Sequence, residues 1–195
     1  GEAFRAAGYR VKRRVYSLTI TEGTRDITFQ DYMGRRSSRF RQQAKRGKKQ
    51  LGELGQTEYV IARDRTDIDK YVEMYESVLA GSWKQPEPFP LFTREVMRAA
   101  ARCGAMRLGL LLLDGKPIAT QFWIVSGGRA QAYKGHYIDE YCGSRCSVGN
   151  LLMVHMIRDA IETDGVRAID LGTGDSEHKR RFCSEARELG GIVAF

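Results

Sequence analysis

The segment from Tyr133 to Lys179 constrains the fold of this chain more than any other part of the sequence. It reads as an aromatic strand (133–139), a polar bend, an apolar helix that opens at Ser147, a short buried strand (168–171) and a polar loop (172–179). A helix that begins between two strands, with a glycine in its first turn, leaves backbone N–H groups available to hold an anion. The sequence therefore predicts an α/β fold with an anion site at this helix start.

Hydrophobic periodicity predicts the elements around this segment. Asp114-Gly115 is a strong type I′ hairpin signal between two apolar runs, and the Gly127-Gly128 pair turns the chain again. The order indicates a mixed, mainly antiparallel α/β sheet flanked by helices. We expect strands at 14–20, 58–62, 106–113, 117–126, 129–138, 168–171 and 191–195, and helices at 29–51, 64–79, 93–103 (capped by Thr93), 147–165 and 179–186.

Length and hydropathy bound the class of protein. At 195 residues the chain is long enough for one domain with a full core. No apolar run approaches the roughly 18 to 20 residues that a membrane span needs. The N-terminus shows no basic region followed by an apolar core, which is the pattern of a signal peptide. We expect a cytoplasmic protein, with the inner face of a membrane as the alternative location.

The net charge of +8 is concentrated in one segment. Eight basic residues and no acidic residue lie between Tyr32 and Gly52, within the run from Arg35 to Lys49. Without these eight, the 32 basic residues fall to 24 and balance the 24 acidic ones. The run is either a solvated helix face or a surface for a polyanion such as CoA phosphates, tRNA or an anionic membrane.

Four cysteines are present, at Cys103, Cys142, Cys146 and Cys183. Without an export signal, we expect reduced thiols. The spacing of Cys142 and Cys146 could ligate a metal, but a structural zinc site needs four ligands and the second cysteine pair is missing. The sequence therefore predicts no metal site.

Three short motifs carry a family resemblance. They are Ser147-x-Gly149-x-Leu-Leu152, then Gly165-x-x-x-Ile-Asp-Leu-Gly172, and then Glu177-His-Lys179. With the three-strand meander before them, these motifs resemble the GNAT acyltransferase superfamily. The most similar branch is the CelD-like one, named for cellulose and exopolysaccharide biosynthesis, with FemAB-type ligases as neighbours. The chain departs from that branch at Val148, where the branch has proline, and at His178, where it has tyrosine. Arg145 lies four residues before Gly149, where the GNAT phosphate loop has three.

The resemblance implies a single GNAT-like domain over residues 1–195, or one half of a tandem GNAT protein. It implies an N-acyltransferase that moves an acyl group, typically acetyl, from acyl-CoA to an amine on a sugar or on a cell-envelope or exopolysaccharide precursor. A homodimer is a further expectation. Two alternatives stay open: a FemAB-like ligase that uses aminoacyl-tRNA, and a non-catalytic GNAT-fold binding module.

The resemblance also places the donor, acetyl-CoA or another acyl-CoA, along the aromatic strand and the helix start. Gly135 is where the strand backbone comes close to the thioester carbonyl. Lys134 and Arg145 contribute positive charge near the pyrophosphate. The pyrophosphate itself is expected at the helix start, on Ser147, Val148, Gly149, Asn150 and Leu151.

Aminolysis of a thioester needs a base for the amine, whose unperturbed pKa is about 10.4, and a proton donor for the leaving thiolate. His136 is a candidate base, because an imidazole titrates near neutrality. Tyr137, on the other face of the strand, is a candidate proton donor. Asp170 and Glu177 are further candidate bases. The alternatives are a half-buried His136 bonded to a neighbour, core packing for Tyr137, and an ion-paired Asp170.

Four residues are candidates for substrate binding: Trp83, Tyr133, His178 and Lys179. Trp83 follows a predicted helix in a proline-rich loop, so it either lines the acceptor pocket or packs a lid. His178-Lys179 takes the place of the Tyr-Lys pair of the branch. Lys179 either holds a substrate anion or is a surface residue of the Lys179-Arg-Arg181 run.

Overall fold

The computed structural model describes residues 1–84, 88–141 and 147–195. Within these ranges, one mixed sheet is formed by the strands β1 (Val11–Gly23), β2 (Thr57–Ala62), β3 (Met106–Leu113), β4 (Lys116–Ser126), β5 (Arg129–Tyr137), β6 (Ala168–Thr173) and β7 (Glu185–Ala194). The strands lie in the order β2-β3-β4-β5-β6-β1-β7. Neighbouring strands are antiparallel except β5 and β6, which are parallel. The predicted fold class is therefore confirmed.

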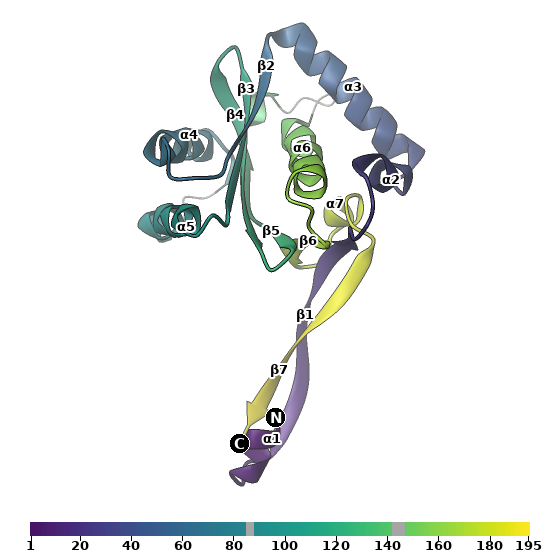
Figure 1. The fold of residues 1–195 in the computed structure, drawn as a ribbon, viewed down its shortest axis with the longest axis vertical. Coiled ribbons are helices and arrows are strands. Elements are labelled where there is room, and N and C mark those ends of the chain that lie inside the picture. Colours follow the sequence, from purple (N-terminus) through teal and green to yellow (C-terminus); the bar gives the residue numbers. More distant parts are fainter. Residues whose placement is uncertain (85–87, 142–146) are drawn as a thin grey trace.

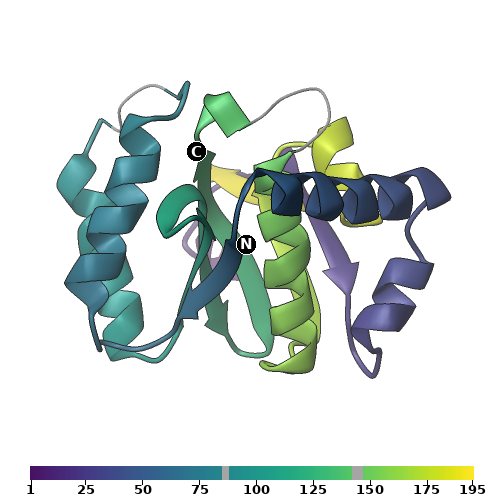
Figure 2. The same ribbon diagram turned by 90° about the horizontal axis from the view of Figure 1, so that it is seen from above.

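Helices cover both faces of this sheet. The helices of the described residues are α1 (Glu2–Ala6), α2 (Phe29–Gly34), α3 (Ser38–Leu54), α4 (Ile68–Ala80), α5 (Pro90–Arg102), α6 (Val148–Glu162) and α7 (Glu177–Arg180), with a 3₁₀ turn at Asp139–Tyr141. α4 and α5 lie on one face, α6 lies on the other, and α3 runs across the outer side of α6 (Figures 1 and 2). Among the described residues, no helix has the length and hydrophobicity that crossing a bilayer requires.

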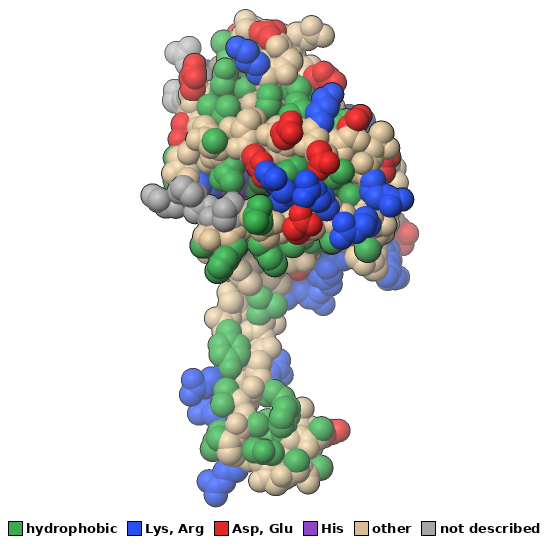
Figure 3. Space-filling view, turned by 90° about the vertical axis from the view of Figure 1, so that its left-hand side faces the viewer, with side chains coloured by type: hydrophobic (Ala, Val, Ile, Leu, Met, Phe, Trp, Pro, Cys, Tyr) green, Lys and Arg blue, Asp and Glu red, His purple; other side chains and the backbone are tan. Residues whose placement is uncertain are grey.

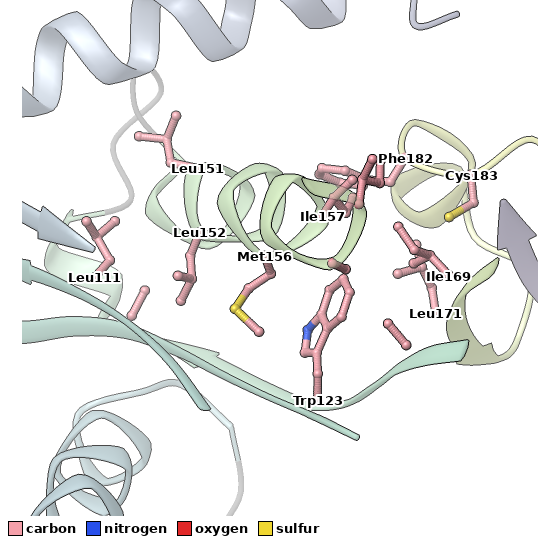
Figure 4. Close-up of a cluster of buried hydrophobic side chains, with 14 of the residues drawn as sticks. Leu111, Trp123, Leu151, Leu152, Met156, Ile157, Ile169, Leu171, Phe182 and Cys183 are labelled. Atoms are coloured by element: carbon pink, nitrogen blue, oxygen red, sulfur yellow. The ribbon is translucent and has the colours of Figure 1, made fainter. Parts of the chain in front are cut away.

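The predicted meander forms the centre of the sheet. Asp114 and Gly115 both have positive φ, 49° and 78°, as a type I′ turn requires, so the predicted hairpin is confirmed. On the α6 face, Trp123 from β4 packs with Leu152, Met156 and other buried apolar side chains (Figure 4). A second, smaller cluster packs β3 and β4 against α4 and α5.

The predicted helix over 29–51 is wrong, because the structure divides it into α2 and α3. Thr28 caps α2 in a capping box, and Ser37 caps α3 by accepting a hydrogen bond from the Phe40 N–H at 3.2 Å. Between the two helices, Arg36 turns inward and its Nη2 donates to the buried carboxylate of Glu22 at 2.8 Å. This partner is distant in the sequence, so the local pattern did not indicate the break.

Other boundaries were also predicted wrongly. α5 begins at Pro90 and not at Thr93, because proline is well suited to the first turn of a helix. The predicted helix at 179–186 is the short α7, and β7 begins at Glu185 and not at Gly191. The reason is that β7 pairs with β1 along its length, which extends both strands.

The far ends of β1 and β7 form a two-stranded ribbon that projects from the body of the molecule (Figure 1). Figure 3 shows hydrophobic side chains along this ribbon, and basic and acidic side chains intermixed over the face of the body that carries α4 and α5. Tyr16, Ile192 and Phe195 are exposed on the ribbon. The predicted strand at 14–20 is the central part of β1.

Candidate functional site

The parallel strands β5 and β6 are paired over a short distance only. Their Cα partners are Arg129 with Ala168, Ala130 with Ile169, and Gln131 with Asp170. Beyond these pairs, β5 continues to Tyr137, and a cavity of about 270 Å³ lies beside it. Its lining comes from β4, β5, β6, α6, α7 and the loop after α4: Lys84, Thr120, Gln121, Trp123, Ala132, Tyr133, Lys134, Gly135, His136, Tyr137, Gly149, Asn150, Met153, Leu171, His178 and Lys179. We call this the β5–β6 cavity.

The charge of the β5–β6 cavity is positive. Three lysines are among the lining residues that the structure describes, Lys84, Lys134 and Lys179, and no aspartate or glutamate is among them. Lys179 Nζ donates to the backbone carbonyls of Gly172, at 3.2 Å, and of Thr173. Partial burial lowers the pKa of Lys179, and the nearby Asp170 carboxylate opposes this shift. The cavity therefore favours a ligand that carries negative charge.

The N-terminus of α6 opens beside this cavity. The N–H groups of Asn150 and Leu151 both donate to the Ser147 carbonyl at 3.0 Å. Helix geometry leaves the preceding N–H groups, those of Val148 and Gly149, for an acceptor outside the helix. The side chains of Val148 and Leu151 are buried in the core, so these two predicted cofactor residues could contact a ligand through the backbone only.

Gly149 has a steric reason to be glycine. A Cβ at this position would lie 2.9 Å from Cδ1 of Tyr137, closer than such atoms approach. The Gly149 carbonyl also accepts a hydrogen bond from Gln121 Nε2 at 3.1 Å, and Gln121 Oε1 accepts from the Trp123 indole N–H at 2.9 Å. Tyr137 and Gln121 thus join the helix start to the sheet. The sequence did not indicate Gln121, because its contact with the Gly149 carbonyl joins residues that are distant along the chain.

His136 lies on the opposite face of β5 from Tyr137. Its side chain is buried, and Nε2 lies 2.9 Å from the Tyr75 hydroxyl of α4, with the two rings edge to face. The contact matches the alternative reading of a histidine bonded to a neighbour. The catalytic role of His136 stays a prediction.

Two residues from the loop after α4 reach β5. Trp83 is 64% exposed, and its indole N–H donates to the Tyr137 hydroxyl at 3.3 Å. Lys84 Nζ donates to the Gly135 carbonyl at 2.5 Å. Of these two adjacent residues in the proline-rich loop, Trp83 is a predicted substrate residue and Lys84 is not.

Asp170 and Glu177 are not among the described residues that line the β5–β6 cavity. Asp170 accepts hydrogen bonds from Thr19 Oγ1 at 2.5 Å and from the Gly172 N–H at 2.8 Å, and it pairs with Arg129 at 3.3 Å. The Glu177 side chain is 89% exposed and lies 3.4 Å from Arg181. The catalytic roles of both carboxylates stay predictions.

α7 meets the start of α6 through His178. A ring nitrogen, Nε2, lies 2.8 Å from Asn150 Oδ1, and the ring packs against Phe182. Loss of hydration lowers the pKa of His178, and the neighbouring Arg181 and Lys179 lower it further. The structure thus brings together two predicted substrate residues, His178 and Lys179, with the predicted cofactor residue Asn150.

Part of the predicted site lies outside the described residues. Arg145, which we expected near the pyrophosphate, is in this group, as are Cys142 and Cys146. Within the described ranges, no group of three or more His, Cys, Asp or Glu side chains has a metal-binding arrangement. The expectation of no metal stays a prediction.

Solved structures with similar folds include the following three. FemX matches with a TM-score of 0.67 and 12% identity, over 99% of this chain and 67% of that chain. A C-terminal domain (DUF2156) assigned to a lysylphosphatidylglycerol synthetase of Agrobacterium fabrum matches with a TM-score of 0.64 and 12% identity, over 99% of this chain and 63% of that chain. L-PGS of Bacillus licheniformis matches with a TM-score of 0.61 and 11% identity, over 100% and 63%. This chain thus spans less than two thirds of the two synthetase chains, and these identities establish similarity of fold alone.

Sequence comparison gives the family directly. No curated protein sequence matches the chain significantly. The family model described as an acetyltransferase (GNAT) domain matches residues 38–180, which include the β5–β6 cavity and the start of α6. Because this match covers most of the chain, the protein belongs to the GNAT acetyltransferase family.

Proposed function

We propose that this protein transfers an acyl group, acetyl in the simplest case, from acyl-CoA to an amine acceptor. The observation that supports this most is the β5–β6 cavity, which opens where two parallel strands separate and adjoins the N-terminus of α6. The free edge of β5 offers backbone groups to the acyl part of a CoA thioester, and the N-terminus of α6 offers N–H groups to its pyrophosphate.

The residues present fit a CoA thioester. The N–H groups of Val148 and Gly149 at the first turn of α6 would hold the pyrophosphate, with Lys134 adding positive charge. Gly135 would bring the β5 backbone close to the acyl group, and Asn150 and Ser147 would border the diphosphate. Bound acyl-CoA supplies an activated thioester carbonyl. The protein has to orient this carbonyl and exclude water from the site. It also has to take a proton from the acceptor amine and give one to the leaving thiolate.

The acceptor amine must lose a proton before it can attack. His136 is the proposed base and Tyr137 the proposed donor to the leaving thiolate. Both lie on β5 and both line the cavity. Asp170 holds the strand edge through Thr19 and Gly172, so its proposed contribution is to position β6.

The acceptor we propose is an amine on a sugar or on an envelope or exopolysaccharide precursor. The three lining lysines, with no acidic residue among the described lining, disfavour polycationic acceptors such as polyamines. A neutral or anionic amine compound meets no such repulsion. Trp83 and Tyr133, both exposed beside β5, are the proposed contacts to its ring.

Thermal unfolding tests the donor directly. A ligand present at about 100 times its Kd stabilises the folded state by about 2.7 kcal/mol, so acetyl-CoA should raise the Tm. Desulfo-CoA, which lacks the acyl thioester, should bind the same helix start and also raise it. An unchanged Tm at about 1 mM of either compound would contradict the proposal, since Kd would then exceed the millimolar range.

A second candidate function is an aminoacyl-tRNA-dependent ligase. The observation in its favour is the outer surface of α3, where Arg39, Arg41, Lys45, Lys48 and Lys49 are all exposed. Among these, the structure gives an ion pair to an acidic side chain for Lys49 alone, with Glu53 at 3.9 Å. Binding of tRNA that weakens steeply with salt, without any response to acetyl-CoA, would favour this function.

We further propose that residues 1–195 act as a single GNAT-like domain. The match to the family over 38–180 and the continuous sheet support this. The homodimer, the tandem arrangement and the place of the protein in the cell stay predictions; analytical ultracentrifugation would decide the first of these.

A further inference from the structure

Lys84 occupies an unusual place at the β5–β6 cavity. It follows Trp83 in the loop after α4, and α4 itself lies on the opposite face of the sheet from α6 (Figure 1). Its side chain is exposed at the surface, yet Nζ reaches the edge of β5 and donates to the Gly135 carbonyl at 2.5 Å. A primary amine of the protein therefore lies where the proposed function requires the amine of an acceptor.

The other two lysines of the cavity are placed differently. Lys179 Nζ is held by the carbonyls of Gly172 and Thr173, on the β6 side of the cavity. The Lys134 ammonium lies 5.9 Å from the ring centroid of Tyr133. Lys84 Nζ, in contrast, donates to the backbone of β5 at Gly135, the strand that would polarise the thioester.

The loop that carries Lys84 is held in place by its neighbour. The Trp83 indole N–H donates to the hydroxyl of Tyr137, the residue that also covers Gly149 at the start of α6. Trp83 and Lys84 therefore contact β5 two residues apart, at Tyr137 and Gly135. This double contact keeps the Lys84 amine close to the proposed donor site.

We propose that Lys84 is a self-acylation site, an intramolecular acceptor for the acyl group of a bound acyl-CoA. This inference rests on the proposed function. The Lys84 ammonium first loses a proton to solvent or to a base. The neutral Nζ then attacks the thioester carbonyl, a C–N bond forms and the C–S bond breaks. The second nitrogen proton passes to the leaving thiolate, which gives acyl-Lys84 and CoA with a free thiol.

Self-acylation would change the cavity in a defined way. The amide has no positive charge, so two lysines would remain where three lined the cavity before. An anionic acceptor would then bind less well, because electrostatic attraction to the cavity is weaker. The modification would also fill space next to Gly135.

The test is a time course of the whole protein with acetyl-CoA, followed by peptide mass spectrometry of every lysine. Lys116 is the internal control, because it is exposed on the β3–β4 hairpin and lies outside the cavity lining. Proximity should make acetylation of Lys84 at least about tenfold faster than that of Lys116. An excess of desulfo-CoA should bring the Lys84 rate down to that of Lys116. In the Lys84→Arg variant, the fast phase should be absent.

The outcomes separate this inference from the proposed function. If acetyl-CoA raises the Tm but Lys84 reacts no faster than Lys116, the self-acylation site is wrong and the donor site stands. Faster labelling of Lys134 or Lys179 would equally overturn the assignment to Lys84. If acetyl-CoA leaves the Tm unchanged and no lysine is labelled, both the inference and the proposed function fail.

Discussion

The two edges of β5 differ in the direction and length of their strand pairing and in what borders them. On one edge, β5 pairs with the antiparallel β4 from Arg129 to Tyr137. On the other edge, it pairs with the parallel β6 over three residue pairs, and the pairing ends at Gln131. The first edge is bounded by buried side chains such as Ala119 and Phe122, whereas the second opens into the β5–β6 cavity. One edge contributes to stability, and the other leaves backbone groups for a ligand.

Local chain geometry explains the difference. β4 and β5 are joined by a tight turn at Gly127-Gly128, both with positive φ, so their register is set by neighbours in sequence. β5 and β6 are joined through α6, as a parallel pair requires a long connection. The start of α6 lies against Tyr137 at the end of β5, where β6 no longer pairs with it.

The largest effect should separate the two edges by stability. Phe122, on β4 at the antiparallel edge, is fully buried, whereas its Cα partner Lys134 on β5 is partly exposed and lines the β5–β6 cavity. Replacing Phe122 by Ala should lower the free energy of unfolding by about 3 to 5 kcal/mol, because it leaves a cavity in the core. Urea denaturation measures this, with Lys134→Ala as the matched variant. Equal losses in the two variants would mean that the edges do not differ as described.

A second change should act on the ligand site at the cavity edge. Gly149→Trp adds a side chain where even a Cβ would lie 2.9 Å from Tyr137, so Tyr137 must move and the α6 start is blocked. The stabilisation by acetyl-CoA, about 2.7 kcal/mol at 100 times Kd, should disappear. Gly52→Trp is the control, because a Cβ at Gly52 in α3 meets no atom within 4 Å. A Gly149→Trp protein whose Tm still rises with acetyl-CoA would place the donor elsewhere.

A third change concerns Gln121 of β4, whose side chain contacts both the buried Trp123 and the start of α6 at the cavity. Gln121 accepts from the buried Trp123 indole N–H and donates to the Gly149 carbonyl. Gln121→Leu should cost about 1 to 3 kcal/mol, because it leaves a buried indole N–H without its partner. It should also weaken acetyl-CoA binding, since the start of α6 loses a link to the sheet. Calorimetric titration beside urea denaturation would report both, and a loss of stability without a loss of affinity would separate Gln121 from the site.

The central hairpin and the start of α6 could be predicted from the sequence, because each depends on residues that are close together in the chain. The Asp114-Gly115 turn, the apolar runs beside it and the helix start at Gly149 are each signalled by neighbouring residues. The break between α2 and α3 could not be predicted, because it depends on Arg36 reaching Glu22, which lies on another element. The full extent of β7 depends in the same way on its pairing with β1.

The residues of the candidate site divide in the same way, into those signalled by their sequence neighbours and those that depend on distant partners. The motif residues Gly149, His178 and Lys179 line one cavity, and their roles there stay predictions. The contact of His136 with Tyr75 and the reach of Lys84 to Gly135 depend on α4 and its following loop packing on the far face of the sheet. Periodicity predicts which face a residue takes, but it does not give the partner on that face.

The smallest expected effect is a dependence of the free energy of unfolding on pH, which compares His155 on α6 with His178 at the β5–β6 cavity. Burial lowers the pKa of His155, which stacks on Tyr59, and loss of hydration lowers that of His178 at the cavity. The unfolded chain then binds more protons than the folded one, so both histidines contribute stability above the unfolded pKa of about 6.5 that is lost as pH falls. Urea denaturation from about pH 7 to about pH 5 should show this loss. His155→Gln and His178→Gln should each make it shallower, and a steeper loss in either variant would reverse the assigned sign.

The most direct test of the central claim is a crystal structure with bound CoA. We expect the pyrophosphate at the N–H groups of Val148 and Gly149, and the thiol end in the β5–β6 cavity beside Gly135. A CoA molecule that lies instead along α3, with the cavity and the start of α6 empty, would contradict the account.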